Sequence, residues 1–416
     1  MKYCKRCMLP ETHETIEYDQ DGVCNICRQQ EYKKEHIDWQ AKQTEFESII
    51  EQYRGMYSFD CIVPFSGGKD STFTLWKLVV QYGLKCLVIC FDHGFRRPKV
   101  LENRLRTFKQ LGVSSLVFRP NWEAVKKVML ESLLRKGDFC WHCHTGIFAY
   151  PMQMAVKLNV PLVIWGEPQA EYTAYYTYDQ VEAGEEEVDE KRFNRYVNLG
   201  ITAEDMLGML NDPTVDMRDL EPFAYPSLRD LKRIKCRSIC LGSFFPWDVK
   251  KQVELIKTEL GWQEDLNAGI PPQYAYEKVE CQLQGIRDYL KQIKRGYSRT
   301  SHLTSIDIRN NRLSREEAVK LVQKYEGKRP YSLGMFLEMM SLTEDEFNRL
   351  AMSHIVRPQS WDPAEVKTGD PLPDQGQWDR TAPLEREYTV RKLREFGLSG
   401  EPELSPADKR KLGTDD

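Results

Sequence analysis

The sequence predicts an α/β fold whose core is a doubly wound parallel sheet. Two observations support this class: apolar segments of strand length recur within residues 58–200, and segments of helical periodicity separate them. Strands this apolar are buried on both faces, and the intervening helices are the crossovers that parallel strands require. The four expected strands cover residues 60–65, 85–91, 115–118 and 161–165.

The expected helices of this core end at residues that stop a helix. Gly83 follows the first helix and Gly112 follows the second, and glycine readily adopts the left-handed conformation of a helix C-terminus. A sheet wound in this way binds ligands beyond the carboxyl ends of its strands, where the strand order reverses. The four expected helices cover residues 71–82, 98–111, 122–135 and 146–158.

Polar turns follow three of the expected strands and should meet at that edge of the sheet. They comprise residues 66–72 (SGGKDST), 92–96 (DHGFR) and 166–172 (GEPQAEY). In the first turn an aspartate follows the lysine, whereas a Walker A loop has Ser or Thr there. We therefore expect nucleotide chemistry of another kind.

The first turn has the residue types of a phosphate cradle. Gly67 and Gly68 let backbone N–H groups approach phosphate oxygens, and the helix that begins near Ser71 points its positive end at the same place. Lys69 adds a positive charge, and as a solvated turn residue it should contribute little to stability. Oxygen ligands suited to Mg²⁺ are offered at this edge by Asp70, with Glu167 or Glu171.

The N-terminus carries two cysteine pairs with the spacing of a zinc ribbon. Cys4-x-x-Cys7 and Cys24-x-x-Cys27 each turn two thiolates toward one point. A reducing cytoplasm disfavours the alternative of two structural disulfides. Because the protein would fill all four ligand positions, we expect a structural Zn²⁺ site.

Length and composition indicate a multidomain protein of the cytoplasm. The chain has 416 residues, a net charge of −4, no leader of charged then apolar residues, and no apolar run long enough for a membrane helix. The balanced charge provides no long-range field for RNA or DNA, so we expect neither a nucleic-acid nor a membrane partner. The expected divisions are a zinc ribbon (1–30), a connector helix (31–57), the sheet core (58–200), a helical region (201–355) and a polar tail (356–416).

The region after residue 200 is predicted to be helical and to close over the sheet. Periodicity indicates helices over residues 247–260 and 278–294, and capping boxes at residues 314–317 and 343–346 mark further helix starts. The acidic stretch at residues 179–195 reads as an exposed insertion that could cover the site. Between the helices lies a polar segment that is either a solvated loop or a clamp for an anionic sugar, formed by Arg295, Arg299 and His302.

The polar turns resemble the motifs of a known superfamily. Residues 66–71 resemble the pyrophosphate loop of the PP-loop ATP pyrophosphatases, and residues 92–94 are similar to their second-strand motif. The resemblance implies a sheet of PP-loop type, splitting of ATP between its α and β phosphates, and adenylation of a substrate oxygen. It implies catalytic roles for Lys69, Asp70, Glu167 and Glu171. It implies ATP contacts from Ser66, Gly67, Gly68, Lys69, Asp70, Ser71, Thr72, Asp92 and His93.

A longer resemblance, from the N-terminus to about residue 350, is to the N-acetyl sugar amidotransferases. It rests on the zinc-ribbon start and on residues 139–144, 164–168, 246–254, 305–309 and 314–318. The resemblance implies conversion of an acetamido group to an acetamidino group on a nucleotide sugar or nonulosonate, in the biosynthesis of lipopolysaccharide or another surface polysaccharide. It also implies ammonia from a separate glutaminase, with or without a cyclase-like subunit.

The residues agree with an external source of ammonia. A built-in glutaminase needs a nucleophilic cysteine, either at the processed N-terminus or beside histidine and acidic partners. Position 2 is Lys, Cys4 is assigned to zinc, and the chain has only seven histidines.

Two alternative functions stay open. Cys140 and Cys143 occupy the position where some PP-loop tRNA thiolases place ligands of an iron–sulfur cluster, so the chain could be a sulfur transferase; Cys236 or Cys240 would supply a third ligand. The alternative is that the pair packs in the core or binds a second metal with His142 or His144. A nucleotide-binding scaffold without catalysis is disfavoured by the intact lysine and aspartate of the first turn.

Overall fold

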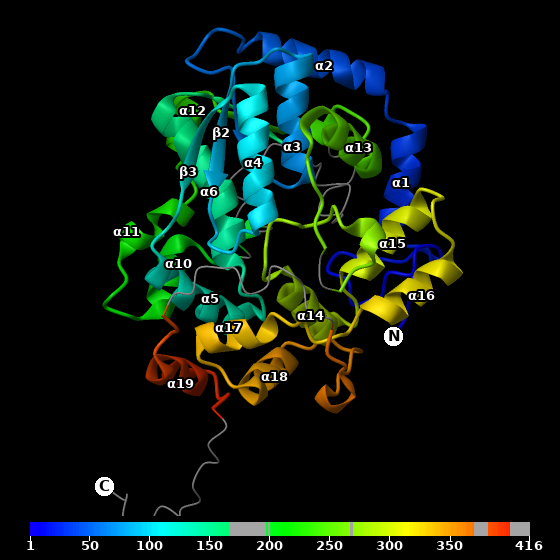
Figure 1. Cartoon of the computed structure of the whole chain (residues 1–416), viewed down its shortest axis with the longest axis vertical. Coiled ribbons are helices and arrows are strands. Elements are labelled where there is room, and N and C mark those ends of the chain that lie inside the picture. The colour runs from blue at the N-terminus through cyan, green and yellow to red at the C-terminus, as the bar shows by residue number, and fades with distance from the viewer. Residues whose placement is uncertain (167–196, 199, 267–268, 370–381, 400–416) are drawn as a thin grey trace, which may run out of the picture.

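The computed structural model describes residues 1–166, 197–198, 200–266, 269–369 and 382–399 (Figure 1). Glu167, Glu171 and the expected insertion at residues 179–195 lie outside the described residues. No helix in the described ranges is long and apolar enough to cross a membrane.

The core is a five-stranded, all-parallel sheet in the order β3-β2-β1-β4-β5. Its strands are β1 (Cys61–Pro64), β2 (Cys86–Phe91), β3 (Ser114–Phe118), β4 (Leu162–Trp165) and β5 (Arg237–Cys240). The four predicted strands are confirmed, each within one residue at either end. Sequence reasoning missed β5, because only two of its four residues, Ile239 and Cys240, are apolar and they show no strand periodicity.

Helices cover both faces of this sheet, so the doubly wound α/β class is confirmed (Figure 1). Val63 and Val88 pack into one apolar core, whereas Ile62 and Leu87 pack into another on the opposite face, as the two-residue period of a strand requires. The first face is covered by α2 (Trp39–Glu51), α3 (Lys69–Trp76), α4 (Pro98–Leu111) and α13 (Val249–Leu260). The second is covered by α6 (Trp141–Leu158) and α12 (Leu228–Arg233).

The four helices predicted for the core are confirmed, with two differences. The first is divided into α3 and a π-helical segment, Lys77–Gln81, and α6 begins at Trp141 rather than at residue 146. The predicted helix at residues 278–294 also begins late, at Gln284. Residues 278–283 are turns whose apolar side chains pack against the core, and this burial imitates helical periodicity in the sequence.

The largest apolar core lies below the carboxyl ends of the strands in Figure 1. It joins Phe91 and Phe95, at the end of β2, to Phe336 and Leu393 in the C-terminal helices. The helices that contribute to it include α5 (Trp122–Lys136), α10 (Ala203–Leu210), α14 (Gln284–Arg295), α17 (Leu333–Met340), α18 (Glu344–Ser353) and α19 (Arg386–Glu395). The expected helical region thus packs directly against the edge of the sheet formed by the carboxyl ends of the strands.

The N-terminal segment docks on the C-terminal helices α15 (Arg299–Arg309) and α16 (Arg315–Tyr325). Tyr297 is buried in one small core with the four N-terminal cysteines, and Arg315 donates to the carbonyl oxygen of Cys4 (2.7 Å). The range expected as one connector helix holds the end of α1 (Asn25–Glu35) and the whole of α2. Both predicted capping boxes are present, at Ser314 with Glu317 and at Thr343 with Glu346.

The range expected as a polar tail contains a helix that belongs to the core. In α19, Leu393 is fully buried, and Lys392 pairs with Glu131 of α5 at 2.9 Å in a buried setting. Helix α19 is short and strongly charged, so its single apolar stripe gave little signal in the sequence.

We expect Leu393→Ala to lower the free energy of unfolding by about 2–4 kcal/mol, the usual cost of emptying a buried leucine site. The matched control is Leu105→Ala on α4, because Leu105 is 66% exposed and its truncation should change stability by less than about 0.5 kcal/mol. Denaturant titration measures both values. Equal effects of the two substitutions would mean that α19 is not part of the core.

Candidate functional site

The turn between β1 and α3 lies where the strand order of the sheet reverses, between β1 and β4. Gly67 has a φ of +93°, and a Cβ at this position would lie 2.7 Å from a methyl carbon of Val100. Gly68 is the N-cap of α3, and a Cβ there would lie 3.0 Å from Oε2 of Glu280. Gly67 therefore requires glycine for its backbone conformation, whereas Gly68 has an ordinary φ of −74° and is approached closely by the end of the Glu280 side chain.

The hydroxyl of Ser71 holds this turn in shape. Ser71 Oγ accepts from the N–H groups of Ser66 and Gly67, both at 3.3 Å, and donates to the carbonyl oxygen of Gly68 at 3.2 Å. Thr72 Oγ1 donates to the same carbonyl at 2.9 Å. The first turn of α3 is thereby fixed with its positive end toward the strand edge, which is the geometry that favours a bound phosphate.

The turn after β2 converges with the first turn, as predicted. Arg96 donates to the carbonyl oxygens of Ser66 and Phe91, so one guanidinium joins the ends of both strands. Asp92 accepts from Arg119 at 2.7 Å; burial opposes its ionisation, but the hydrogen bond from Arg119 and the charge of Arg96 lower its pKa. Burial and the charge of Arg96 lower the pKa of His93 to about 3, so this imidazole is neutral.

Lys69 is buried, which corrects the expectation of a solvated turn lysine. Its side chain is 4% exposed, and its ammonium lies 2.7 Å from Oδ2 of Asp70 and 2.8 Å from Oε2 of Glu277. Burial opposes ionisation of Glu277, but the charges of Lys69, Lys278 and Arg299, together with the hydrogen bond from Lys69, lower its pKa to about 2. The other oxygen of Asp70, Oδ1, is buried with no hydrogen-bond partner among the described residues. That oxygen fits the requirement for a ligand of Mg²⁺.

Sequence reasoning missed three residues that contact the turn from the C-terminal half of the chain. Glu277 pairs with Lys69, Glu280 approaches Gly68, and Trp262 Nε1 donates to the carbonyl oxygen of Gly67 at 3.1 Å. Nothing in the sequence distinguishes these two glutamates from the many other acidic residues of the chain. Their role depends on a contact between segments about 200 positions apart, which local patterns do not report.

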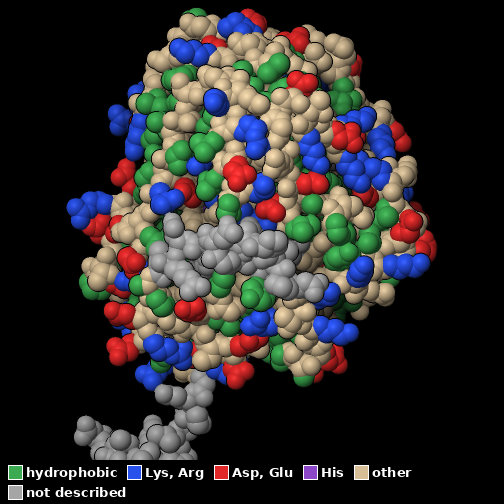
Figure 2. Space-filling model, viewed as in Figure 1, with side chains coloured by type: hydrophobic (Ala, Val, Ile, Leu, Met, Phe, Trp, Pro, Cys, Tyr) green, Lys and Arg blue, Asp and Glu red, His purple; other side chains and the backbone are tan. Residues whose placement is uncertain are grey.

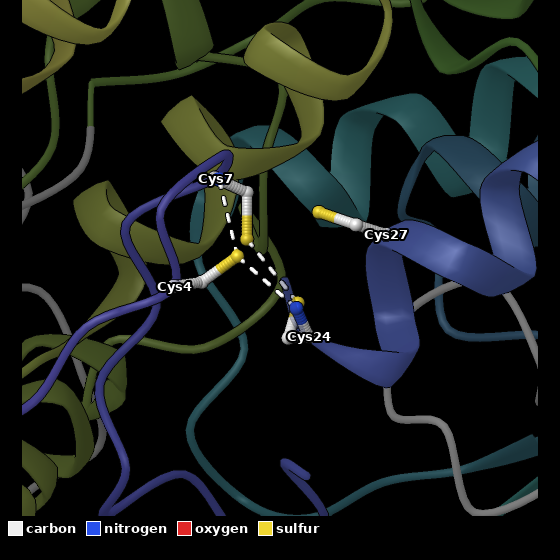
Figure 3. Close-up of side chains that lie close together, drawn as sticks. All are labelled: Cys4, Cys7, Cys24 and Cys27. Carbon is white, nitrogen blue, oxygen red and sulfur yellow. Dashed lines mark hydrogen bonds between the residues drawn. The ribbon is translucent and has the colours of Figure 1, made fainter. Parts of the chain in front are cut away.

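The four N-terminal cysteines form a candidate metal centre (Figure 3). Their sulfur atoms lie within 4.8 Å of one another, all four residues are buried, and the side chains point toward a common centre. The sulfur atoms of Cys7 and Cys24 are 3.6 Å apart, near the roughly 3.8 Å that tetrahedral Zn–S bonds of about 2.3 Å impose. The mutual hydrogen bonds of the cluster lower the pKa of Cys4 and Cys7 and raise the pKa of Cys27, so the four thiols interact closely.

Cys140 and Cys143 lie at the start of α6, one turn apart, and border the largest core. The third cysteine that borders this core is Cys281, whose backbone pairs with that of Arg96 in an isolated antiparallel β-bridge. Cys236 and Cys240, considered as a third ligand, instead lie beside and within β5. Burial raises the pKa of Cys143 to about 12 and that of Cys281 to about 11, and the Cys281 thiol adds to the shift of Cys143. In the described part of the chain, only the N-terminal cysteines form a tight group of three or more metal-ligand atoms.

The predicted anion clamp is not a solvated loop. The segment is a short turn at Gly296 followed by the buried start of α15. Arg295 pairs with Glu14 at 3.3 Å, and Arg299 pairs with Asp288 at 2.7 Å. Burial lowers the pKa of His302, so its imidazole is neutral. Contact of these residues with a sugar stays a prediction.

Residues 273–370 match the family model "LPS biosynthesis protein WbpG-like, C-terminal domain". The similarity is confined to this region of the chain. The match supports the predicted resemblance to the N-acetyl sugar amidotransferases, and we call residues 273–370 the WbpG-like domain. Glu277 and Glu280 both lie in it, so the WbpG-like domain supplies the partner of Lys69.

Two further similarities cover parts of the chain. "Uncharacterized protein MJ1599" of Methanocaldococcus jannaschii is 22% identical over 165 residues, 39% of this chain and 58% of that protein's length. The solved structure "U34-tRNA thiolase NcsA from Methanococcus maripaludis with its [4Fe-4S] cluster" aligns with 78% of this chain and 87% of its own chain, at 14% identity. Its TM-score of 0.32 is too low to support an argument about fold or function.

We expect protein purified without chelators to contain zinc, and Cys24→Ser to lose it, because a four-thiolate site cannot keep its affinity with three. The damage should be a destabilised N-terminal segment. Cys143→Ser is the matched control and should retain the zinc, since Cys143 lies outside the four-cysteine group. Elemental analysis measures the metal content, and equal zinc in the two variants would exclude this site.

Proposed function

We propose that the protein is an ATP-dependent amidotransferase that converts the acetamido group of a sugar to an acetamidino group. One observation carries the proposal: Glu277 of the WbpG-like domain contacts Lys69 in the glycine-lysine turn at the reversal of strand order. The part of the chain that resembles an ATP-splitting loop therefore meets the part that matches a family of lipopolysaccharide biosynthesis.

The proposed reaction has two steps. First, the acetamido oxygen attacks the α-phosphorus of ATP, so that an O–P bond forms and pyrophosphate leaves. Ammonia then adds to the activated carbon, a proton is lost, and AMP leaves with the former acetamido oxygen. The second step is favourable because AMP is a far better leaving group than the oxygen of an unactivated amide.

The residues of the turn suit the first of these steps. The N-terminal end of α3, together with Lys69, would bind the phosphates and stabilise the charge of the departing pyrophosphate. Asp70 would hold Mg²⁺ through Oδ1, together with Glu167 or Glu171, and the ion would neutralise phosphate charge. Ser66, Asp92 and His93 complete the proposed ATP site. Zn²⁺ would have a purely structural role in the four-cysteine centre.

The acceptor and the ammonia source are proposed from the resemblance and from the chemistry. We take the acceptor to be a nucleotide sugar or nonulosonate of surface-polysaccharide biosynthesis in the cytoplasm, bound near Arg295, Arg299 and His302. Ammonia is mostly protonated near neutral pH, and only the unprotonated form attacks. A docked glutaminase, with or without a cyclase-like subunit, would deliver it in the reactive form and keep water from the adenylated intermediate.

A tRNA sulfur transferase is the second candidate, and the observation that favours it is the position of Cys281. Together with Cys140 and Cys143 it places three thiols at the margin of one core. On the face shown in Figure 2, however, basic and acidic side chains are interspersed, which does not favour a long polyanion there.

We expect Lys69→Gln to reduce release of pyrophosphate from ATP by at least about 100-fold, since removal of one oriented donor to a developing charge commonly has this effect. The amide substitution is chosen because Lys69→Ala would leave Glu277 buried without its partner. Lys109→Gln, an exposed substitution on α4, is the control and should retain activity. A coupled pyrophosphate assay measures turnover, and thermal unfolding of both variants verifies the fold. Activity retained by Lys69→Gln would contradict the ATP assignment.

We expect the isolated protein to form the amidine with high ammonium at raised pH, where unprotonated ammonia is abundant, but not with glutamine. Addition of the glutaminase should restore use of glutamine. Mass spectrometry of the sugar measures the reaction, because exchange of oxygen for NH lowers the mass by about one unit. Use of glutamine by the protein alone would refute the separate subunit, and thiolation of tRNA with a sulfide donor would support the second candidate.

A further inference from the structure

The WbpG-like domain and the neighbouring Trp262 contact the glycine-lysine turn at three successive residues. Trp262 donates to Gly67 at 3.1 Å, Glu280 lies against the position where Gly68 would carry a side chain, and Glu277 pairs with Lys69 at 2.8 Å. Two of these contacts place carboxylates at a turn whose backbone geometry suits a phosphate. The turn is therefore occupied by negative charge from another part of its own chain.

This arrangement conflicts with a bound triphosphate. The ammonium of Lys69 already lies between Asp70 and Glu277, and its side chain is only 4% exposed. Phosphate oxygens that approach Lys69 would meet the carboxylates of Glu277 and Glu280, and like charges in a buried site repel strongly. For the triphosphate to bind, Glu277 has to give up Lys69.

Movement of Glu277 would alter contacts inside the WbpG-like domain. Arg299, at the start of α15, donates to the backbone carbonyl of Glu277 at 3.4 Å. The guanidinium of Arg299 also pairs with Asp288 of α14 at 2.7 Å, with both side chains largely buried. Glu277 is thus tied to the loop by its side chain and to two helices through its backbone.

We propose that Glu277 is a positioning residue that holds Lys69 until ATP binds, and that its displacement by the triphosphate signals nucleotide occupancy to the WbpG-like domain. The inference rests on the proposed function, since it requires ATP at the turn. It adds that the domain expected to bind the sugar is coupled to the nucleotide site. Such coupling is reciprocal, so an acceptor that favours the displaced state strengthens ATP binding by the same factor.

The test uses an ATP analogue with a methylene group between the α and β phosphorus atoms, which binds without being split. In the wild-type protein we expect its binding to accelerate hydrogen–deuterium exchange over residues 277–300. In Glu277→Gln we expect about tenfold tighter binding of the analogue, because a repelling charge is gone, and no acceleration of exchange. Asp288→Asn should keep the wild-type affinity but show a smaller exchange response, because the link through Arg299 is weakened.

The matched control is Glu344→Gln in the same domain, where Glu344 forms a partly exposed ion pair with Arg329. This variant should bind the analogue and respond to it as the wild type does. Unchanged affinity and an unchanged exchange response in Glu277→Gln would overturn the proposal, as would a wild-type protein that binds the analogue without any response at residues 277–300. Absence of binding to the wild type would instead refute ATP as a ligand, and with it the proposed function. Thermal unfolding of each variant verifies that the fold is intact.

Discussion

The ion pair between Lys69 and Glu277 is the interaction on which the arrangement of this protein depends. It joins the loop of the sheet core to the WbpG-like domain, and both side chains are largely withdrawn from water. A buried ammonium requires a partner because its desolvation is costly, and here the partner comes from a distant part of the chain. The pair is buried at the glycine-lysine turn, which is the turn that we propose binds ATP.

The fold surrounds this pair with rigid elements. Arg96 ties the ends of β1 and β2 together, and Ser71 closes the turn from within. Below the strand ends, one apolar core contains residues of the sheet and of helices as late as α19, so the C-terminal half packs directly against the sheet. The four-cysteine centre is fixed in turn by Tyr297 and Arg315 of the WbpG-like domain. The four-cysteine centre and α19 therefore both contact the C-terminal part of the chain whose Glu277 meets the glycine-lysine turn.

Much of the sheet core could be predicted because its signals are local. Four strands are recognisable in the sequence as isolated apolar runs. Helix α4 ends at Gly112 because glycine adopts the left-handed conformation found there (φ +62°). Strand β5 and helix α19 give no such signal, since their burial comes from neighbours that are distant in the sequence. The assignment of Lys69 as a solvated residue was wrong for the same reason.

The sequence by itself determined the parallel sheet, the glycine-lysine turn at its edge and the two C-x-x-C pairs of the candidate metal centre. Each of these follows from the chemistry of adjacent residues. Only the tertiary structure decided which acidic residue meets Lys69, which cysteine lies beside Cys140 and Cys143, and whether Arg299 faces solvent. Those outcomes depend on long-range packing: Glu277, Cys281 and Asp288 are brought into place by the docking of the WbpG-like domain on the sheet. Burial then fixes their charges, and no pattern of neighbouring letters encodes a partner 200 residues away.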